Sequence, residues 1–247
     1  MKSSSPSVLE PSEVLDVLRN LVANPERPLE RGLAITEGRT AVLQLMRSGR
    51  LVHGIVGDPA LVPNPTVALN RSELATLLGF DLRSPVVAVA EARDDDALSL
   101  TYPIVALDGI HDATNVGAIM RTVAALGIPS VLRDSRSTSP WLRRSVRASM
   151  GACFFVRSAA VDDLAAYLAD QRAEGRVVVG LETGPGTIPL GDCPRPDILV
   201  VGNEGHGLRP SVRAVCNSLA AIPMALPHTS LNVVQASAIG MWELWTR

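Results

Sequence analysis

The chain has 247 residues, which is enough for one large domain or two modest ones. Hydrophobic residues make up 47% of it but aromatic residues only 3%, so the core must be built from Ala, Val, Leu and Ile, as in buried parallel strands covered by helices. The net charge of −2 excludes a protein that attracts nucleic acid through overall positive charge.

Neither export nor membrane insertion is indicated. The N-terminal segment lacks the apolar core of a signal peptide, and no apolar run approaches the roughly 20 residues of a membrane helix. Cys153, Cys193 and Cys216 are widely spaced and form no CxxC pair, which indicates small buried thiols in a reducing compartment. The four histidines lack the spacing of a metal motif. We therefore expect a cytoplasmic protein without a metal site.

The first part of the chain predicts a small α/β unit at residues 12–93, after a Ser/Pro-rich tail at 1–11 that is expected to be disordered. The predicted elements are a helix at 11–23, a helix at 39–48, a strand at 51–56, a helix at 71–79 with a serine N-cap and a glycine stop, and a strand at 84–91. The acidic stretch EARDDDALS that comes next lacks periodicity. It predicts a linker at 94–101, with a solvated hairpin tip as the alternative.

From residue 102 to 247, strands and helices alternate regularly. Strands are predicted at 102–107, 129–132, 154–157, 176–182, 197–202 and 219–223, and helices at 115–126, 140–150, 161–173, 209–217 and 231–245. This alternation predicts an α/β fold with a mostly parallel sheet covered by helices on both faces.

Three segments place small or polar residues where a predicted strand ends or a helix begins, the position at which α/β folds bind ligands. They are NVGAIMR (115–121), LVVGNEGHGL (199–208) and IPMALPHTSLNVVQASAIG (222–240). Each also has a purely structural interpretation: Asn115 as a helix cap, the glycines as a turn, and Ser230 as an N-cap with Asn232 in the first helical turn. The glycine loop matches neither a Walker A motif nor GxGxxG. Glu204 within it would repel a phosphate and fits better beside a cation or a hydroxyl.

Together, in this order and spacing, the three segments resemble the signature motifs of the TrmH/SpoU family of RNA ribose 2′-O-methyltransferases, in the SPOUT superfamily. The resemblance covers residues 102–247. A weaker similarity relates residues 37–56 to the small substrate-binding domain that many members carry. DATN at 112–115 departs from the usual DPxN-like turn, and PHTS at 227–230 varies the third motif. The resemblance implies a deep C-terminal trefoil knot, S-adenosylmethionine as cofactor, and a homodimer with the active site near its interface.

Carried over by position, the resemblance implies two groups of site residues. Cofactor contacts, mainly through backbone groups, are expected at Gly202, Ile222 and Leu231, with Asn203, Gly205, Met224 and Thr183 around them. Catalytic or substrate-positioning roles are expected for Asn115, Arg121, Glu204, Ser230 and Asn232.

For Arg121, the role given by the family account disagrees with elementary chemistry. The family account makes this arginine a general base, but a guanidinium stays protonated in proteins. We expect Arg121 instead to bind a substrate phosphate and to stabilise the developing alkoxide. Asn115, Ser230 and Asn232 would orient the ribose or hold the loops. Glu204 would support the cofactor pocket or fix Arg121.

Residues 133–157 contain six arginines against one acid. RNA contacts are predicted at Arg136, Arg143, Arg144 and Arg147, because Arg143 and Arg147 lie one helical turn apart; a solvated helix face is the alternative. Ribosomal RNA is favoured as substrate, since the N-terminal part resembles members that act on large rRNA. The alternatives are a tRNA 2′-O-methyltransferase, a catalytically silent relative that binds RNA or ribosomes, and a nucleotide-dependent enzyme of another class.

Overall fold

The computed structural model describes residues 8–23, 32–226 and 230–246. Its contacts divide the chain into two compact units. The first takes in the chain up to Arg93 together with Trp141–Phe155, and the second comprises Asp94–Pro140 and Val156–Arg247. The first unit therefore contains a segment that a single boundary near residue 94 would assign to the second.

The first unit is built on a four-stranded sheet in the order β1-β4-β2-β3. Its strands are β1 Leu33–Glu37, β2 Val52–Gly57, β3 Val67–Ala68 and β4 Val86–Glu91. Strand β4 is antiparallel to β1 and β2, and β3 is parallel to β2. The helices are α1 Pro11–Ala23, α2 Arg39–Arg47, α3 Arg71–Leu78 and α5 Arg143–Ser149. Apolar side chains of α1 and α3 pack against those of β1, β2 and β4 to form the core.

The second unit is built on a seven-stranded sheet in the order β7-β6-β5-β10-β8-β11-β9, in which every neighbouring pair is parallel. Its strands are β5 Ile104–Asp108, β6 Ser130–Asp134, β7 Arg157–Val161, β8 Val178–Leu181, β9 Ile188–Pro189, β10 Ile198–Gly202 and β11 Ser218–Ala221. The predicted α/β class with a mostly parallel sheet is confirmed.

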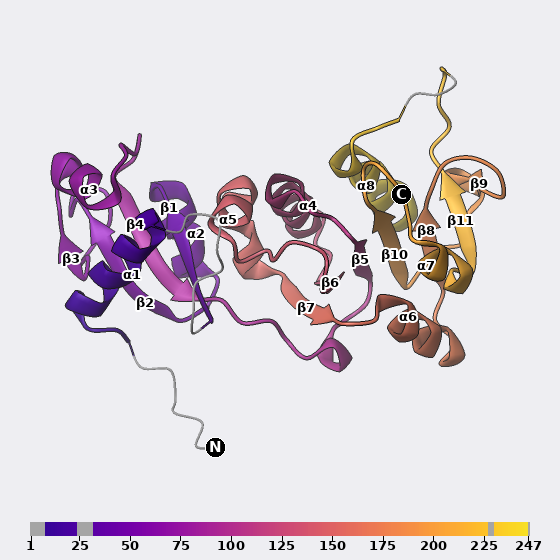
Figure 1. Ribbon diagram of the computed structural model, residues 1–247, viewed down its shortest axis with the longest axis horizontal. Helices are drawn as coiled ribbons and strands as arrows, with labels where there is room; N and C mark the ends of the chain where they lie inside the picture. Colours follow the sequence, from indigo (N-terminus) through magenta and orange to yellow (C-terminus); the bar gives the residue numbers. More distant parts are fainter. Residues whose placement is uncertain (1–7, 24–31, 227–229, 247) are drawn as a thin grey trace. The chain divides into compact units, whose positions relative to one another are not determined.

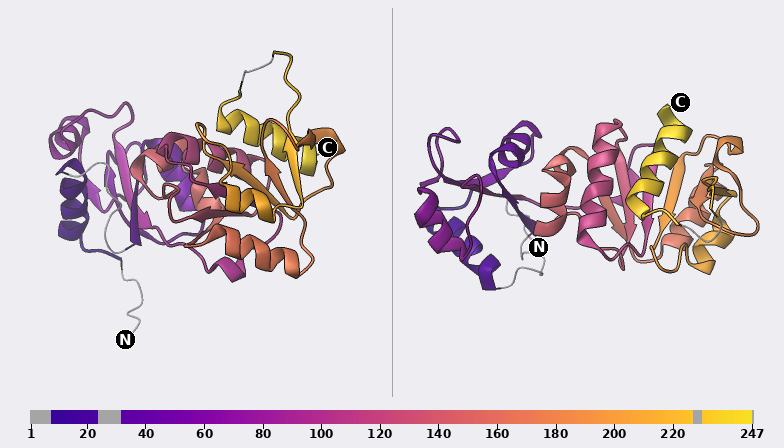
Figure 2. Two further views of the ribbon diagram at one scale, coloured as in Figure 1. Left: turned by 45° about the vertical axis from the view of Figure 1, so that its right-hand side comes forward. Right: turned by 90° about the horizontal axis from the view of Figure 1, so that it is seen from above.

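Helices cover both faces of this sheet, as Figure 1 and Figure 2 show. They are α4 Ala113–Ala125, α6 Leu164–Ala173, α7 Pro210–Val215 and α8 Val233–Met241. Helices α4 and α8 contact each other on one face, and α6 and α7 contact each other on the other. Leu164, Leu168 and Val212 from α6 and α7 enter the core with Ile104 and Val200 of the central strands.

Three local predictions are wrong. Helix α3 is capped by Asn70 rather than by a serine: its side chain accepts the Ser72 and Glu73 N–H groups, while Glu73 accepts the Asn70 N–H in return. Helix α8 is capped by Asn232 rather than by Ser230, because the Asn232 side chain accepts the Val234 N–H at 2.8 Å. The third error concerns a strand.

The predicted strand at 154–157 is instead a 3₁₀ turn, η3 Ala152–Phe155, and the strand begins only at Arg157. Phe154 is buried and packs against Trp141 at a centroid distance of 6.1 Å, so this aromatic pair belongs to the first unit. Helix α1 begins at Pro11, where the sequence predicts a helix, and residues 1–7 of the predicted tail lie outside the described part of the chain.

The predicted acidic linker is held against the second unit. Asp94 pairs with Arg133 at 2.6 Å. The Asp95 N–H donates to the Ser158 carbonyl at 2.6 Å, and the Asp95 carboxylate accepts the Ser158 N–H at 3.1 Å. A short 3₁₀ helix, η2 Ala97–Ser99, comes next under the cap of Asp96. The acids of this stretch therefore stabilise a defined path along strand β7.

The three cysteines are free thiols. Cys153 is buried, and this burial raises the pKa of its thiol to about 12; Cys193 and Cys216 are half-buried. Among the described residues, no group of His, Cys, Asp and Glu is placed to hold a metal ion. Within the same residues, no helix combines the length and apolarity needed to span a bilayer.

An ion triad holds together the carboxyl edge of the second sheet. Asp108 and Asp134 end the adjacent strands β5 and β6, and both are buried. Arg209, the residue before α7, binds Asp108 through Nε at 2.5 Å and through its backbone N–H at 2.8 Å, and its Nη2 lies 3.1 Å from Asp134. Asp134 also accepts the Gly109 N–H at 3.1 Å and the Ser137 hydroxyl at 2.7 Å. The triad thus joins the loops that come after β5, β6 and β10.

We predict that Arg209→Met destabilises the protein by about 3–5 kcal/mol, because it leaves two buried carboxylates without their cation. Arg213→Met is the matched control, since Arg213 is exposed on helix α7, which follows Arg209. We expect it to change stability by less than about 0.5 kcal/mol. Urea denaturation followed by circular dichroism measures both. Equal stabilities for the two variants would contradict a structural role for the triad.

Candidate functional site

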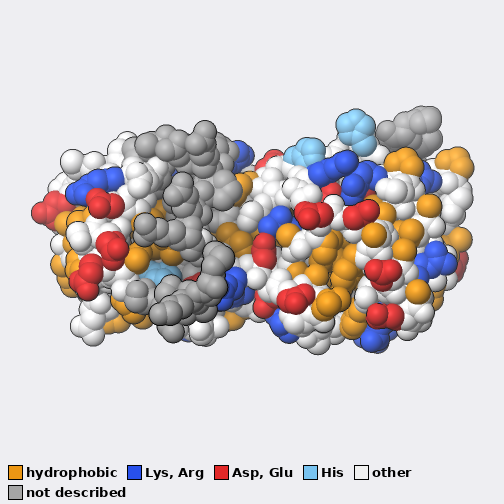
Figure 3. Space-filling model, turned by 60° about the horizontal axis from the view of Figure 1, so that its bottom comes forward, with side chains coloured by type: hydrophobic (Ala, Val, Ile, Leu, Met, Phe, Trp, Pro, Cys, Tyr) orange, Lys and Arg blue, Asp and Glu red, His pale blue; other side chains and the backbone are white. Residues whose placement is uncertain are grey.

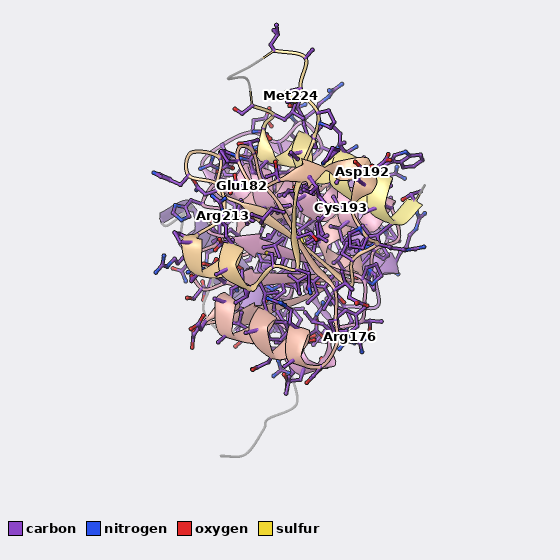
Figure 4. The ribbon with its side chains drawn as sticks, turned by 90° about the vertical axis from the view of Figure 1, so that its right-hand side faces the viewer. Arg176, Glu182, Asp192, Cys193, Arg213 and Met224 are labelled. Atoms are coloured by element: carbon purple, nitrogen blue, oxygen red, sulfur yellow. The ribbon has the colours of Figure 1, made fainter. Side chains whose placement is uncertain are left out.

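A pocket of about 430 Å³ opens at the carboxyl ends of β8, β10 and β11. Its wall is formed by residues 181–183 on and after β8, residues 201–207 on and after β10, positions 220, 222 and 224 on and after β11, and positions 230, 231, 233 and 236 before and within α8. The volume lies within the roughly 300–1,000 Å³ of small-molecule sites. In Figure 4, Glu182, after β8, and Met224, after β11, lie toward the upper end of the sheet, and Arg176, before β8, lies toward the lower end.

The pocket gathers all of the residues proposed to bind a cofactor. Segments that lie far apart in the sequence meet here because parallel strands end at one edge of the sheet. The seven residues are Thr183, Gly202, Asn203, Gly205, Ile222, Met224 and Leu231. Of the proposed catalytic residues, Glu204 and Ser230 also line the wall.

The glycine loop after β10 closes tightly on itself. Asn203 and Gly207 exchange backbone hydrogen bonds of 2.8 and 3.1 Å. A Cβ at Gly202 would lie 2.5 Å from the Gly207 carbonyl oxygen, so only glycine fits there. Gly207 has a φ of +67°, which favours glycine. Gly205 shows neither constraint, since its nearest neighbour to an added Cβ is the Asn203 side chain at 3.5 Å.

Two side-chain contacts join this loop to the segment after β5, one at Gly109 and one at Asn115 of the first motif. The Asn203 amide donates to the Gly109 carbonyl at 2.9 Å, and its own oxygen accepts the Gly205 N–H at 2.9 Å. The Asn115 amide donates to the Glu204 carboxylate. Asn115 lies in the first turn of α4, and the cap is Asp112, whose carboxylate accepts the Thr114 N–H at 2.7 Å. Asn115 therefore has no capping role and is oriented by Glu204.

Arg121 is exposed two turns along α4. In the described parts of the chain its guanidinium makes no hydrogen bond or ion pair. One of the two expectations for Glu204, that it fixes Arg121, is not what the structure shows, because Glu204 binds Asn115. Asn232 is exposed and holds the start of α8 as its cap. The segment at 227–229, within the varied third motif, lies outside the described residues.

Glu182 is a pocket residue that the sequence predictions passed over. Its carboxylate accepts the Thr183 N–H at 2.9 Å and the Leu208 N–H at 3.0 Å, and it is half-buried in the pocket wall. The signal that could have found it is its position: an acid directly after the apolar strand at 178–181 lies at the carboxyl edge of a parallel sheet.

The predicted RNA-contacting arginines have different surroundings. Arg136, Arg144 and Arg147 are exposed, whereas Arg143 is half-buried. Arg143 instead pairs with the buried Glu37 and lies 4.5 Å over the Phe80 ring. Arg143 and Arg147 thus do not present a common solvated face. On the side of the molecule shown in Figure 3, acidic and basic side chains are interspersed, in keeping with the small net charge.

The chain matches known proteins over most of its length. A family model described as the SpoU rRNA Methylase family matches residues 102–242. An uncharacterized tRNA/rRNA methyltransferase of Mycobacterium ulcerans is 32% identical, over 84% of this chain and 75% of that protein. The structure of a protein assigned to the TrmH family of RNA methyltransferases, from Porphyromonas gingivalis, has a TM-score of 0.82 and 28% identity, and covers 98% of each chain.

A second solved structure, that of the SpoU methyltransferase AviRb from Streptomyces viridochromogenes, has a TM-score of 0.78 at 23% identity and covers 93% of this chain and 96% of that one. At this identity the likeness concerns the fold alone. The family model matches more than half of the chain, and its range includes all three segments at the carboxyl edge of the sheet. The chain therefore belongs to the TrmH/SpoU family of RNA methyltransferases.

Proposed function

We propose that the protein transfers a methyl group from S-adenosylmethionine to a ribose 2′-hydroxyl of RNA, with ribosomal RNA favoured. The observation that carries this proposal is the joining of one pocket to the first motif through the Asn115–Glu204 hydrogen bond. That contact places the residue proposed to orient the ribose beside the residues proposed to hold the cofactor. Further support comes from membership of the SpoU rRNA Methylase family over residues 102–242. Two proteins that share the fold are AviRb, solved in complex with S-adenosylmethionine, and an RNA 2′-O ribose methyltransferase.

The pocket suits this cofactor chemically. When bound, S-adenosylmethionine supplies a methyl group on a positively charged sulfur. Two carboxylates, Glu182 and Glu204, line the pocket, and no Lys or Arg does so among the described residues. We assign the neutral parts of the molecule to backbone groups near Gly202, Ile222 and Leu231, which line the pocket. A cation held among acids and backbone groups avoids the desolvation penalty of an unpaired buried charge.

The residues around the pocket divide the remaining work. Asn115, held by Glu204, orients the ribose hydroxyl. Arg121, through its exposed guanidinium, binds an RNA phosphate and stabilises negative charge as it develops on the hydroxyl oxygen. We assign no general-base role to Arg121, because its guanidinium is already protonated and cannot accept a further proton. Ser230 lines the pocket, and Asn232 fixes the first turn of α8 beside it.

The same proposal includes the wider architecture implied by the family. We propose a deep trefoil knot in the C-terminal part, with β10 between β5 and β8 in the sheet. The small first unit would bind RNA, with Arg144 and Arg147 at its surface. The protein would act in the cytoplasm. A catalytically silent relative that only binds RNA remains the second candidate, and binding of S-adenosylmethionine would argue against it.

Arg121→Lys tests the function and the role of the guanidinium together. We expect it to lower the methylation rate about 100-fold, because an ammonium cannot make the bidentate contact, while the Kd for S-adenosylmethionine stays within twofold. The site is found by mapping 2′-O-methylation across total RNA in cells without the gene, complemented by wild type or by the variant. Near-wild-type turnover of Arg121→Lys would show that bidentate geometry is not needed. A map unchanged by loss of the gene would contradict the proposed activity.

Gly202→Ala tests the pocket. The added Cβ meets the backbone of Gly207 and Leu208, so the loop must open, and we expect cofactor affinity to fall at least about tenfold. Gly205→Ala in the same loop is the control, because its Cβ meets only ordinary contact and should change affinity less than twofold. Isothermal titration calorimetry gives both Kd values. Equal effects of the two substitutions would contradict the assignment of this loop.

Trp242→Glu tests the homodimer. Ile239 and Trp242, on α8 and the π-helix η5 Trp242–Thr246, are 41% and 54% exposed, and we propose that they lie in the interface. A charge placed in an apolar interface is costly because it is desolvated without a partner, so the variant should sediment as a monomer. Met150→Glu, at an exposed apolar residue of the first unit, should not. A wild-type protein that sediments as a monomer would refute the dimer.

A further inference from the structure

We infer that Glu182 makes the pocket select the positively charged cofactor over its neutral demethylated product. This inference rests on the proposed function, since it concerns the same pocket. It assigns a specificity role to a residue outside the three motifs, on the loop after β8.

The Glu182 carboxylate is fixed in place. Its two oxygens accept separate backbone N–H groups, from Thr183 at 2.9 Å and from Leu208 at 3.0 Å. These donors come from two different loops, so rotation of the carboxylate would break one contact or both. The carboxylate fits because residue 207 is a glycine: a Cβ on Gly207 would lie 2.6 Å from Glu182 Oε2. A negative charge is thus held at a defined point of the pocket wall.

The second acid of the pocket is engaged differently. Glu204 is exposed and accepts the Asn115 amide. Its charge is therefore already engaged with the first motif. Glu182 is half-buried and has accepting capacity left, because each carboxylate oxygen carries two lone pairs. A partly buried charge is screened less by salt and water than an exposed one. Glu182 therefore dominates the preference of the pocket for charge.

The two forms of the cofactor differ by one positive charge at sulfur. S-adenosylmethionine carries it, and S-adenosylhomocysteine does not. At an effective dielectric constant of about 20, a carboxylate and a unit cation about 12 Å apart attract each other by ~1.4 kcal/mol, which is about tenfold in Kd. Such a difference weakens retention of the product relative to the substrate, which helps turnover when both are present.

Calorimetric titration of Glu182→Gln with three ligands tests the inference. The probes are S-adenosylmethionine, S-adenosylhomocysteine and sinefungin, which carries an amine cation in place of the sulfonium. We expect both cationic ligands to bind about tenfold more weakly to the variant, and the neutral product to change less than twofold. Asp192→Asn is the matched control: it removes the same charge from an exposed residue outside the pocket, which Figure 4 shows apart from Glu182. It should leave all three Kd values within twofold.

Two outcomes separate charge selection from a purely structural role. If Glu182→Gln weakens all three ligands equally, Glu182 only holds the loops and the inference is wrong. Unchanged Kd values overturn it as well. A wild-type protein that binds none of the three overturns the proposed function itself, whereas tight binding without charge preference overturns the inference alone.

Salt provides a test that needs no variant. Ions screen a charge contribution, so the wild-type ratio of the Kd for S-adenosylhomocysteine to that for S-adenosylmethionine should shrink as NaCl is raised from 50 to 500 mM. This measurement decides the matter if Glu182→Gln fails to fold, as judged by its thermal unfolding. A ratio that does not exceed one at 50 mM NaCl would refute charge selection, because the pocket would then have no preference for the cation.

Discussion

The ion triad of Arg209, Asp108 and Asp134 is the interaction on which the site depends. Parallel strands bring their carboxyl ends to one edge, but the loops that leave this edge have no regular hydrogen bonding of their own. One guanidinium reaches two buried carboxylates at the ends of β5 and β6. Asp134 in turn receives the Gly109 N–H, and the Gly109 carbonyl receives the Asn203 amide. The path from the triad to the pocket wall is therefore continuous.

Besides the triad, close approach of backbone segments determines the shape of the pocket. Around the pocket, Gly202 and Gly207 let the loop fold onto itself, and Gly207 leaves the space in which the Glu182 carboxylate accepts the Leu208 N–H. Tight packing and charge are thus coupled, because Gly207 determines where the Glu182 carboxylate can lie. A pocket built in this way holds its charges before any ligand arrives, which is the condition for selective binding at low cost in reorganisation.

The sequence predicted the parallel sheet and the position of the pocket well, because apolar runs ending in polar residues report directly on strand ends. It predicted less where several residues compete for one local role. Ser230 and Asn232 are both good N-caps, and only the path of the chain decides for Asn232. Phe154 reads as a strand residue until Trp141 is known to lie beside it. Arg143 is predicted to contact RNA because its partner Glu37 lies 106 residues away and no local pattern reveals the pair. Glu182 escaped notice because a single acid carries no motif.

The placement of Trp141–Phe155 with the first unit bears on how the two parts of this protein can change over evolutionary time. The chain passes between the units after residues 93, 140 and 155, so the first unit is discontinuous in sequence. A gene fragment that ends near residue 93 would lack helix α5, and with it the Arg143 partner of the buried Glu37. Loss or exchange of residues 1–93 alone would leave helix α5 without the sheet that it packs on, and would separate Arg143 from Glu37. The two units are therefore expected to be inherited together, as one piece.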